Sequence, residues 1–288
     1  MKKYSIEEII GGLRSFWQRE GAVALEALDL NVGAGTFHPE TFFRALGPNP
    51  WFCCFCQPSR RPADGRYGEN PNRCQLFHQF QVFCKPAPKN LLELYFASLE
   101  EIGISQQEND IRLLEDNWSS PTLGAWGLGW EVRLNGLEIT QYTYFQQVGG
   151  ISCSPVGGEI AYGVERLALQ IQEKDSVFDL TWSDKNNLSY RDLFFERERQ
   201  GSFYNFQYSD CSALSDYFNA NRQQAELLLE HHLPEAAYEM VLMMSNIFNL
   251  LDARRTISAA ERPGLILQIR RLACRCAKEF TSLVSCRF

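Results

Sequence analysis

Residues 57–73 read Gln57-Pro-Ser-Arg-Arg-Pro-Ala-Asp-Gly-Arg-Tyr-Gly-Glu-Asn-Pro-Asn-Arg73, and this loop contains four arginines but only one aspartate and one glutamate. Strand-like apolar runs flank it at residues 52–56 and 74–84. The loop is too rich in Pro, Gly and Asn to form core. Because a guanidinium group binds phosphate oxygens through paired hydrogen bonds, a hairpin with these arginines at its tip indicates a nucleotide site.

The chain as a whole is acidic, although this loop is basic. Its formal net charge is −7 over 288 residues, so the surface should not attract nucleic acid, and RNA contacts would come from local patches or from a partner. The sequence has no run of about 18 apolar residues, and we expect no membrane span. Its first residues lack the apolar core of a signal peptide, so we expect a cytoplasmic protein.

The ten cysteines lack the spacing of a disulfide framework in a chain of this length. Cys53 and Cys56 match half of a zinc or redox motif, but they share one strand-like run, and no second pair has the spacing of a zinc site. The same holds for Cys274 and Cys276. We expect the cysteines to pack as small apolar side chains, and we expect no zinc.

The order of the elements predicts an α+β fold. Ser5 and Glu8 form a capping box that opens a helix ending near Gly21, and residues 89–102 form an amphipathic helix. Strands are expected at residues 111–118, 130–135 and 137–146, and the dipeptide Asn135-Gly136 joins the last two as a hairpin. Antiparallel strands with helices between them argue against a doubly wound parallel sheet.

The pattern changes near residue 210, and three helices with apolar stripes are expected beyond it, at residues 212–231, 234–251 and 258–284. These helices predict a bundle appended to the sheet. We therefore expect two domains, a sheet domain of residues 1–205 and a helical domain of residues 206–288. The join at residues 204–210 is polar and aromatic, which favours a packed linker.

A second element complements the arginine loop. Residues 157–171 read as a strand that runs into a helix, with small residues at Ala161 and Gly163 and an arginine, Arg166, at the start of the helix. Small residues on a strand let a flat ring approach the backbone. An arginine at the following helix can lie over that ring or reach its phosphates. Together with the hairpin, this element predicts an ATP site.

At these residues the chain resembles a known family. Residues 60–73, with Phe77 four residues beyond, are similar to the second signature motif of class II aminoacyl-tRNA synthetases, and Gly158–Arg166 is similar to the third. Further stretches resemble the α subunits of bacterial heterotetrameric glycyl-tRNA synthetases over nearly the whole chain: Val32–Thr36, Arg44–Pro48, Glu115–Trp118, Thr122–Glu131, Thr140–Gly150 and Phe248–Arg254.

The resemblance implies an antiparallel six-stranded catalytic sheet flanked by helices. It also implies glycine activation by ATP with Mg²⁺, and a homodimer formed through the N-terminal helix and strand. A separate β subunit would do most of the recognition of tRNA(Gly), in an α₂β₂ assembly. The acidic charge balance agrees with that division of labour.

The resemblance also assigns roles to residues of the ATP site. Arg60 and Arg166 are the expected catalytic residues, with Arg60 on the α-phosphate and Arg166 over the adenine and near the γ-phosphate. Arg73 is a second, weaker phosphate or hairpin contact, and Glu69 approaches the adenine or the loop. Arg61 and Arg66 could take any of these places, because adjacent residues of a strand face opposite ways. The remaining expected ATP contacts are Phe77, Gln141 and Gly163.

The glycine site is expected to involve Glu159, where the third motif usually has a glycine. A carboxylate beside a nucleotide needs a positive partner, so we predict that Glu159 binds the ammonium group of glycine; the alternative is a surface glutamate at a strand end. Trp118, Trp126 and Trp130 would form a wall against larger side chains, or else belong to an aromatic core. Thr140 or Gln141 would touch ribose or glycine, and Glu138 would help to hold Mg²⁺.

The leading prediction is a glycine–tRNA ligase α subunit. Its first alternative is a class II paralogue that passes an aminoacyl-adenylate to an acceptor other than tRNA. The second is an inactive binding scaffold. The joint presence of Arg60, Glu69, Arg73, Glu165 and Arg166 argues against a scaffold, because unpaired guanidinium groups are costly to bury.

Overall fold

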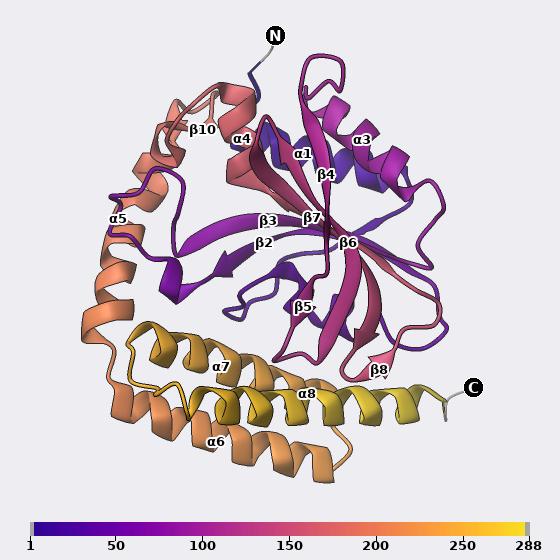
Figure 1. Ribbon diagram of the computed structural model, residues 1–288, viewed down its shortest axis with the longest axis vertical. Coiled ribbons are helices and arrows are strands. Elements are labelled where there is room, and N and C mark those ends of the chain that lie inside the picture. Colours follow the sequence, from indigo (N-terminus) through magenta and orange to yellow (C-terminus); the bar gives the residue numbers. More distant parts are fainter. Residues whose placement is uncertain (1–2, 286–288) are drawn as a thin grey trace.

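The computed structural model describes residues 3–285. Within them, nine strands form one sheet in the order β1-β2-β3-β9-β7-β6-β4, with β5 paired to β6 and β8 paired to β7, and a separate ribbon contains β10 and β11 (Figure 1). The sheet strands are β1 (Val23–Ala24), β2 (Trp51–Arg60), β3 (Leu76–Lys85), β4 (Ile111–Asp116), β5 (Ser119–Ser120), β6 (Ala125–Leu134), β7 (Leu137–Val148), β8 (Ile151–Ser152) and β9 (Gly158–Gly163). The ribbon strands are β10 (Thr181–Ser183) and β11 (Leu188–Ser189).

Six longer strands, β2, β3, β9, β7, β6 and β4, each run antiparallel to their neighbours, whereas β1 pairs with β2 in parallel. The described helices are α1 (Ile6–Arg19), α2 (Pro39–Phe42), α3 (Leu91–Glu101), α4 (Val164–Gln172), α5 (Tyr190–Phe203), α6 (Cys211–Glu230), α7 (Pro234–Ala253) and α8 (Arg262–Ser285). The mainly antiparallel sheet with its helices confirms the predicted α+β fold.

One face of the sheet packs against α1, α3 and α4. The buried rings of Trp17, Tyr95 and Tyr162 belong to this core, and Nε1 of Trp17 donates a hydrogen bond of 3.2 Å to the hydroxyl of Tyr162. The capping box of Ser5 and Glu8 opens α1 as predicted. This apolar core fixes the back of the sheet and leaves the other face for the site.

The opposite face of the sheet shares a second core with the C-terminal helices. Tyr238 of α7 stacks on Phe42 of α2 with ring centroids 4.3 Å apart, and Phe145 of β7 is buried in the same cluster. Helix α5 descends beside the sheet to a π-helix, Tyr204–Tyr208, which leads into α6 (Figure 1). The boundary predicted near residue 205 lies in this π-helix.

The hairpin between β6 and β7 forms as predicted, with positive φ angles of 50° at Asn135 and 90° at Gly136. The predicted strand at residues 130–135 is longer in the structure and begins at Ala125. The glycines at its start are required by the close neighbouring strand, because a Cβ at Gly129 would lie 1.9 Å from the carbonyl oxygen of Tyr142. Glycine and tryptophan in this segment therefore belong to a paired strand.

Cysteines of β2 lie in the cores, as expected for small apolar side chains. Cys53 and Cys54 are fully buried, and burial raises the pKa of the Cys53 thiol to about 12, so it stays protonated. Helix α8 begins at Arg262, four residues later than predicted, because Ser258 and Glu261 first form a capping turn. None of the helices between residues 3 and 285 combines the length and the hydropathy that crossing a membrane requires.

Candidate active site

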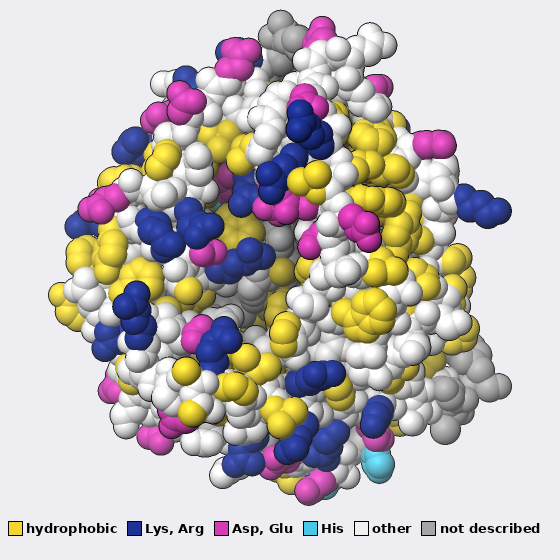
Figure 2. Space-filling model, in the orientation of Figure 1, with side chains coloured by type: hydrophobic (Ala, Val, Ile, Leu, Met, Phe, Trp, Pro, Cys, Tyr) yellow, Lys and Arg dark blue, Asp and Glu magenta, His cyan; other side chains and the backbone are white. Residues whose placement is uncertain are grey.

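A cavity of about 430 Å³ opens on the sheet between the β2–β3 hairpin, β7, β9 and the start of α4. Figure 2 shows a hollow near the middle of this face, with basic and acidic side chains at its rim. Ten of the predicted site residues line the cavity: Arg61, Arg73, Phe77, Trp118, Glu138, Thr140, Gln141, Glu159, Gly163 and Arg166. Four others lie outside it: Arg60, Glu69, Trp126 and Trp130.

The structure places Arg61 at the cavity, not Arg60. The guanidinium of Arg61 lies over the ring of Phe77, 4.9 Å from its centroid, and its Nε donates to the carbonyl oxygen of Gly33 at 3.1 Å. Arg60 ends β2 opposite Leu76. Arg60 is not among the residues that line the cavity. Burial lowers the pKa of Arg60, as does the positive charge of Arg197 on α5.

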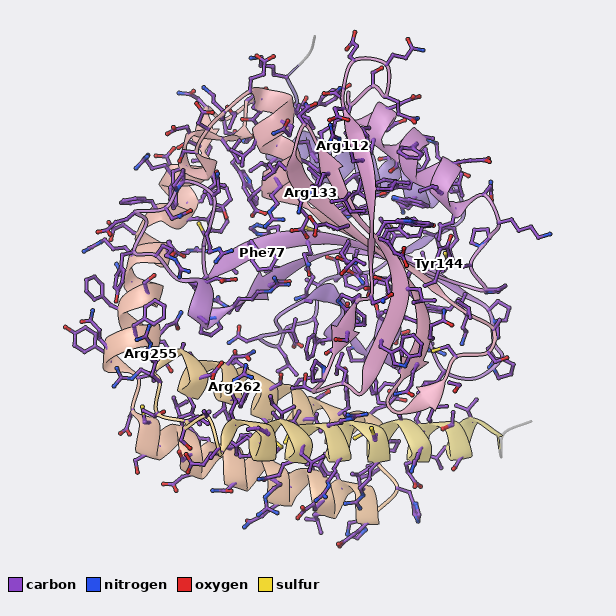
Figure 3. The ribbon with its side chains drawn as sticks, in the orientation of Figure 1. Phe77, Arg112, Arg133, Tyr144, Arg255 and Arg262 are labelled. Carbon is purple, nitrogen blue, oxygen red and sulfur yellow. The ribbon has the colours of Figure 1, made fainter. Side chains whose placement is uncertain are left out.

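The structure thus places Arg61, and not the expected Arg60, in the lining of the cavity, because adjacent strand residues face opposite ways. The other candidate, Arg66, folds back on the loop, where its Nη1 donates to the carbonyl oxygens of Ala63 and Gly65. Glu69 is exposed at the loop tip. Figure 3 labels Phe77, the β3 residue on which Arg61 stacks.

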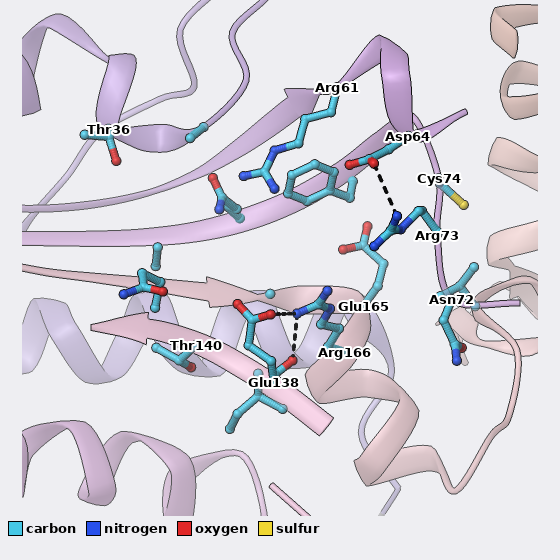
Figure 4. Close-up of a pocket in the computed structure, with 18 of the residues that line it drawn as sticks. Thr36, Arg61, Asp64, Asn72, Arg73, Cys74, Glu138, Thr140, Glu165 and Arg166 are labelled. Carbon is cyan, nitrogen blue, oxygen red and sulfur yellow. Dashed lines mark hydrogen bonds and ion pairs between the residues drawn. The ribbon is translucent and has the colours of Figure 1, made fainter. Parts of the chain in front are cut away.

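Two further arginines stand at the mouth of the cavity (Figure 4). Nη1 of Arg166, in the first turn of α4, donates to Oε2 of Glu138 at 2.6 Å and to the Glu138 carbonyl oxygen at 3.0 Å. Arg73 lies 3.7 Å from Asp64. Both arginines are partly exposed, so an anionic ligand can displace their carboxylate partners at modest cost.

Glu159 lies at the closed end of the cavity and is only 1% exposed. Its Oε1 accepts hydrogen bonds from Oγ1 of Thr36, at 2.7 Å, and from Nε2 of Gln81. Burial raises the pKa of Glu159 to about 7, although these two hydrogen bonds oppose the shift. The alternative of a surface glutamate is wrong, because β9 runs in the middle of the sheet between β3 and β7.

Of the three tryptophans, only Trp118 lines the cavity, where it packs on Phe145 at 5.5 Å. Trp130 lies on the opposite face and packs against Tyr142 at 5.3 Å. Trp126 is 42% exposed. Trp126 and Trp130 are four residues apart on β6, so they share a face of the sheet. The predicted wall of three tryptophans is therefore wrong for these two.

The β7 residues of the lining are already hydrogen-bonded. The hydroxyl of Thr140 accepts a hydrogen bond of 2.9 Å from the hydroxyl of Tyr95 on α3, which packs on the opposite face of the sheet. Nε2 of Gln141 donates to Asp116 at 3.0 Å. At Gly163, a Cβ would meet its nearest protein atoms at 3.5 Å, an ordinary contact. Gly163 lines the cavity, so its backbone is open to a ligand there.

The sequence prediction assigned no role to several residues of the site. Thr36 is one of them, and it lies in a short 3₁₀ helix, Gly35–Phe37. The sequence feature that could have indicated Thr36 is the Gly-Ala-Gly turn just before it. Glu165 is another. Its carboxylate lies 2.7 Å from Nδ1 of His78 and accepts from the hydroxyl of Tyr190 at 3.0 Å, so it connects β3 to α5.

Within residues 3–285, the structure has no group of three or more His, Cys, Asp or Glu side chains placed to hold a metal ion. Glu138 has one carboxylate oxygen free of Arg166 and is 39% exposed. A Mg²⁺ ion commonly binds one or two carboxylates together with substrate phosphates and waters. Glu138 fits such a role as a single ligand.

The chain is similar in structure to two solved proteins from Desulfitobacterium hafniense. One is PylSc, a pyrrolysyl-tRNA synthetase, with 12% identity, a TM-score of 0.46 and coverage of 64% of this chain and 73% of that one. The other is described as pyrrolysyl-tRNA synthetase, with 11% identity, a TM-score of 0.42 and coverage of 62% and 73%.

The sequence itself matches a family model described as glycyl-tRNA synthetase alpha subunit, over residues 6–284. The match includes the hairpin arginines, the buried Glu159 and the three C-terminal helices. The chain therefore belongs to the family of glycyl-tRNA synthetase alpha subunits, which are class II aminoacyl-tRNA synthetases.

Proposed function

We propose that this chain activates glycine with ATP to form glycyl-adenylate and, with a β subunit, transfers the glycyl group to the 3′ end of tRNA(Gly). The observation that carries the proposal is the polarity of the cavity. A buried carboxylate, Glu159, lies at the closed end, and three arginines, Arg61, Arg73 and Arg166, surround the open end. A small zwitterion and a polyanion can therefore occupy one cavity side by side.

Glycine fits the closed end with its ammonium group on Glu159. The carboxylate of Glu159 has Oε2 free of the hydrogen bonds that Thr36 and Gln81 make to Oε1, so Oε2 can accept from the ligand. Trp118 lines the same cavity, and in this proposal its indole blocks the side chain of a larger amino acid. Exclusion by bulk is sufficient, because no amino acid is smaller than glycine.

ATP fits the open end, with its adenine above Gly163 and beneath Arg166 and its phosphates near Arg61 and Arg73. Arg61 takes the α-phosphate role that Arg60 was expected to play. Glu138 would hold Mg²⁺ together with the phosphates, and the ion would supply positive charge to the leaving pyrophosphate. When the nucleotide binds, Arg166 exchanges its ion pair with Glu138 for a contact with the nucleotide. The exchange costs little free energy, because both side chains are partly exposed.

The reaction needs no general base from the protein. A carboxylate oxygen of glycine attacks the α-phosphorus, and the bond to the bridging oxygen breaks as pyrophosphate leaves with the electron pair. Arg61 stabilises the negative charge that develops on the α-phosphate oxygens. The terminal ribose hydroxyl of the tRNA then attacks the glycyl carbonyl carbon, the bond from that carbon to the phosphate oxygen breaks, and AMP leaves with the hydroxyl proton on its phosphate.

The proposed assembly is α₂β₂, with a homodimer of α subunits formed through α1 and β1. Strand β1 is at the end of the sheet order and pairs with β2, and Val23 in it is 52% exposed. This edge can accept a second copy, which supports the proposed dimer. The β subunit supplies most of the tRNA contacts, in keeping with the net charge of −7.

The test is ATP–pyrophosphate exchange driven by each amino acid in turn, with and without the β subunit. We expect exchange with glycine to exceed exchange with alanine by at least about 100-fold, as steric exclusion by a packed indole allows. Equal activity with alanine would overturn the proposal. Exchange with glycine but no transfer to tRNA would favour the paralogue, and no exchange at all would favour the inactive scaffold.

The glycine KM is expected to depend on pH through Glu159. Its pKa of about 7 means that the carboxylate is protonated below pH 7 and then attracts the glycine ammonium less strongly. We expect the glycine KM to rise roughly tenfold for each pH unit below 7, with a plateau above pH 8. The measurement is exchange kinetics from pH 6 to 8.5. An unchanged glycine KM across this range would contradict the assignment of Glu159.

A further inference from the structure

The arginine loop, residues 61–75, packs its backbone directly on helix α5. A Cβ added to Gly68 would lie 2.6 Å from Cε2 of Phe195, and one added to Gly65 would lie 2.8 Å from Oγ of Ser202. Figure 1 shows α5 beside the loop that joins β2 to β3, on the side away from the rest of the sheet. The loop that carries the phosphate-binding arginines therefore rests on this helix.

Glu198 of α5 connects two separate parts of that loop. The side chain is only 2% exposed. Its Oε1 accepts from the backbone N–H of Arg66 at 2.8 Å, and its Oε2 accepts from the backbone N–H of Gln75 at 2.8 Å. Oγ of Ser202 donates to Oε1 at 3.2 Å and accepts from the backbone N–H of Tyr67 at 3.0 Å.

The contact with Gln75 reaches Arg61 in one further step. The carbonyl oxygen of Gln75 accepts a hydrogen bond of 2.8 Å from the backbone N–H of Arg61. Glu198 thus holds the residue that fixes the backbone of Arg61. Arg73 is two positions before Gln75 in the part of the loop that leads into β3. The contact between Glu198 and Gln75 therefore also helps to position the side chain of Arg73.

A carboxylate is the only side chain that satisfies this arrangement. The two backbone N–H groups point to different oxygens, and glutamine would present an NH₂ group to one of them. Within residues 3–285 no Lys, Arg or His forms an ion pair with Glu198, so its charge is compensated by N–H and O–H donors. A carboxylate that is desolvated in this way needs all of these donors.

We propose that Glu198 is a positioning residue for adenylate formation, which holds the arginine loop so that Arg61 and Arg73 stand at the cavity before ATP arrives. The inference rests on the proposed function. Its physical basis is preorganisation: a loop that is not anchored must be ordered when ATP binds, and the ordering entropy opposes ATP binding and the transition state. The glycine end is formed by other residues, because Glu159 and its partners Thr36 and Gln81 lie outside the loop. The loop reaches the turn before Thr36 through the hydrogen bond from Arg61 to Gly33.

The test compares Glu198→Gln with the matched control Glu196→Gln in the complex with the β subunit. Glu196 is two residues away on the same helix, is exposed and pairs with Arg199. For Glu198→Gln we expect the KM for ATP to rise roughly tenfold and kcat of exchange to fall roughly tenfold, since one buried donor loses its acceptor. The KM for glycine is expected to stay within about twofold, because Glu159, Thr36 and Gln81 form their hydrogen bonds with one another and, among the described residues, none with the loop.

A second readout follows the loop itself. Trypsin is expected to cleave after Arg66 and Arg73 faster in Glu198→Gln than in the wild type, and saturating ATP is expected to slow this cleavage. Ser202→Ala is a milder variant that keeps the carboxylate and removes the hydroxyl bridge to Tyr67. It is expected to raise the KM for ATP in the same direction, by about threefold.

A purely structural role would lower the melting temperature of Glu198→Gln and leave its ATP KM and kcat equal to those of Glu196→Gln; that result would overturn the inference. If Glu198→Gln does not fold, an unchanged ATP KM in Ser202→Ala would overturn it instead. The wild-type complex is measured in the same assay. If it shows glycine-dependent exchange, the failure of either variant to change the ATP KM counts against the inference alone. A wild type without such exchange would overturn the proposed function and the inference with it.

Discussion

Replacing Glu159 by glutamine is expected to raise the glycine KM of ATP–pyrophosphate exchange by at least about 100-fold. Removing one partner of a buried ion pair costs about 3–5 kcal/mol, and each 1.4 kcal/mol corresponds to about a factor of ten. Glutamine is a clean replacement here. Its Oε1 can still accept from Thr36 and Gln81, while its NH₂ group replaces the oxygen that is free for the ligand.

The same variant is expected to be more stable than the wild type above pH 7. The folded-state pKa of Glu159 is raised from 4.5 to about 7, so its contribution to stability is fully present below pH 4.5 and is lost as the pH rises through 7. The loss at pH 8 is about 3 kcal/mol as an upper bound. Urea unfolding at pH 8 and at pH 5 measures this difference in the free energy of unfolding, and the gain in stability of the variant should be largest at pH 8.

A glycine KM of the variant within about threefold of wild type, a change worth under about 1 kcal/mol, would exclude Glu159 from the glycine site.

Replacing Arg61 by alanine is expected to lower kcat/KM for ATP by roughly 100- to 1,000-fold, as for loss of one preorganised donor to a developing negative charge. Arg60→Ala is the matched control. It removes the same side chain from the adjacent position, but Arg60 does not line the cavity. We expect it to reduce kcat/KM by less than about fivefold, or under about 1 kcal/mol.

Exchange kinetics at saturating glycine separate the two arginines. A loss that is larger for Arg60→Ala than for Arg61→Ala would return the α-phosphate role to Arg60. Arg61→Lys is informative as well. Lysine keeps the charge but cannot form the bidentate contact or stack on Phe77 in the same way, so an intermediate loss is expected.

Local signals in the sequence were sufficient for much of the fold. The capping box at Ser5 and the Asn135-Gly136 turn each specify one backbone geometry, and the structure has both. Glu159 was singled out because the third motif usually has a glycine at this position, and a carboxylate beside a nucleotide needs a positive partner. These signals depend on residues close in sequence, which is why sequence alone reveals them.

The predictions that differ from the structure concern the face of a strand on which a side chain lies. Whether Arg60 or Arg61 enters the cavity depends on where β2 ends, and a shift of one residue exchanges the two. Trp126 and Trp130 stand near glycines like a pocket wall, but the pleat turns both away from the site. Glu198 could not be found at all, since its partners are 123 and 132 residues away in the chain.

The stacked rings of Phe42 and Tyr238 have a consequence for how such a chain can change over evolution. The same packing is tight elsewhere between the helices and the sheet. At Gly149, in the turn after β7, a Cβ would lie 2.3 Å from Cβ of Ala277 on α8, so not even one additional carbon atom fits there. A substitution on the inner side of α7 or α8 therefore changes the packing of strand β7, and other residues of β7 line the site. A change of side-chain volume in the C-terminal helices therefore has to be accommodated by the sheet that carries the site, because both belong to one apolar cluster.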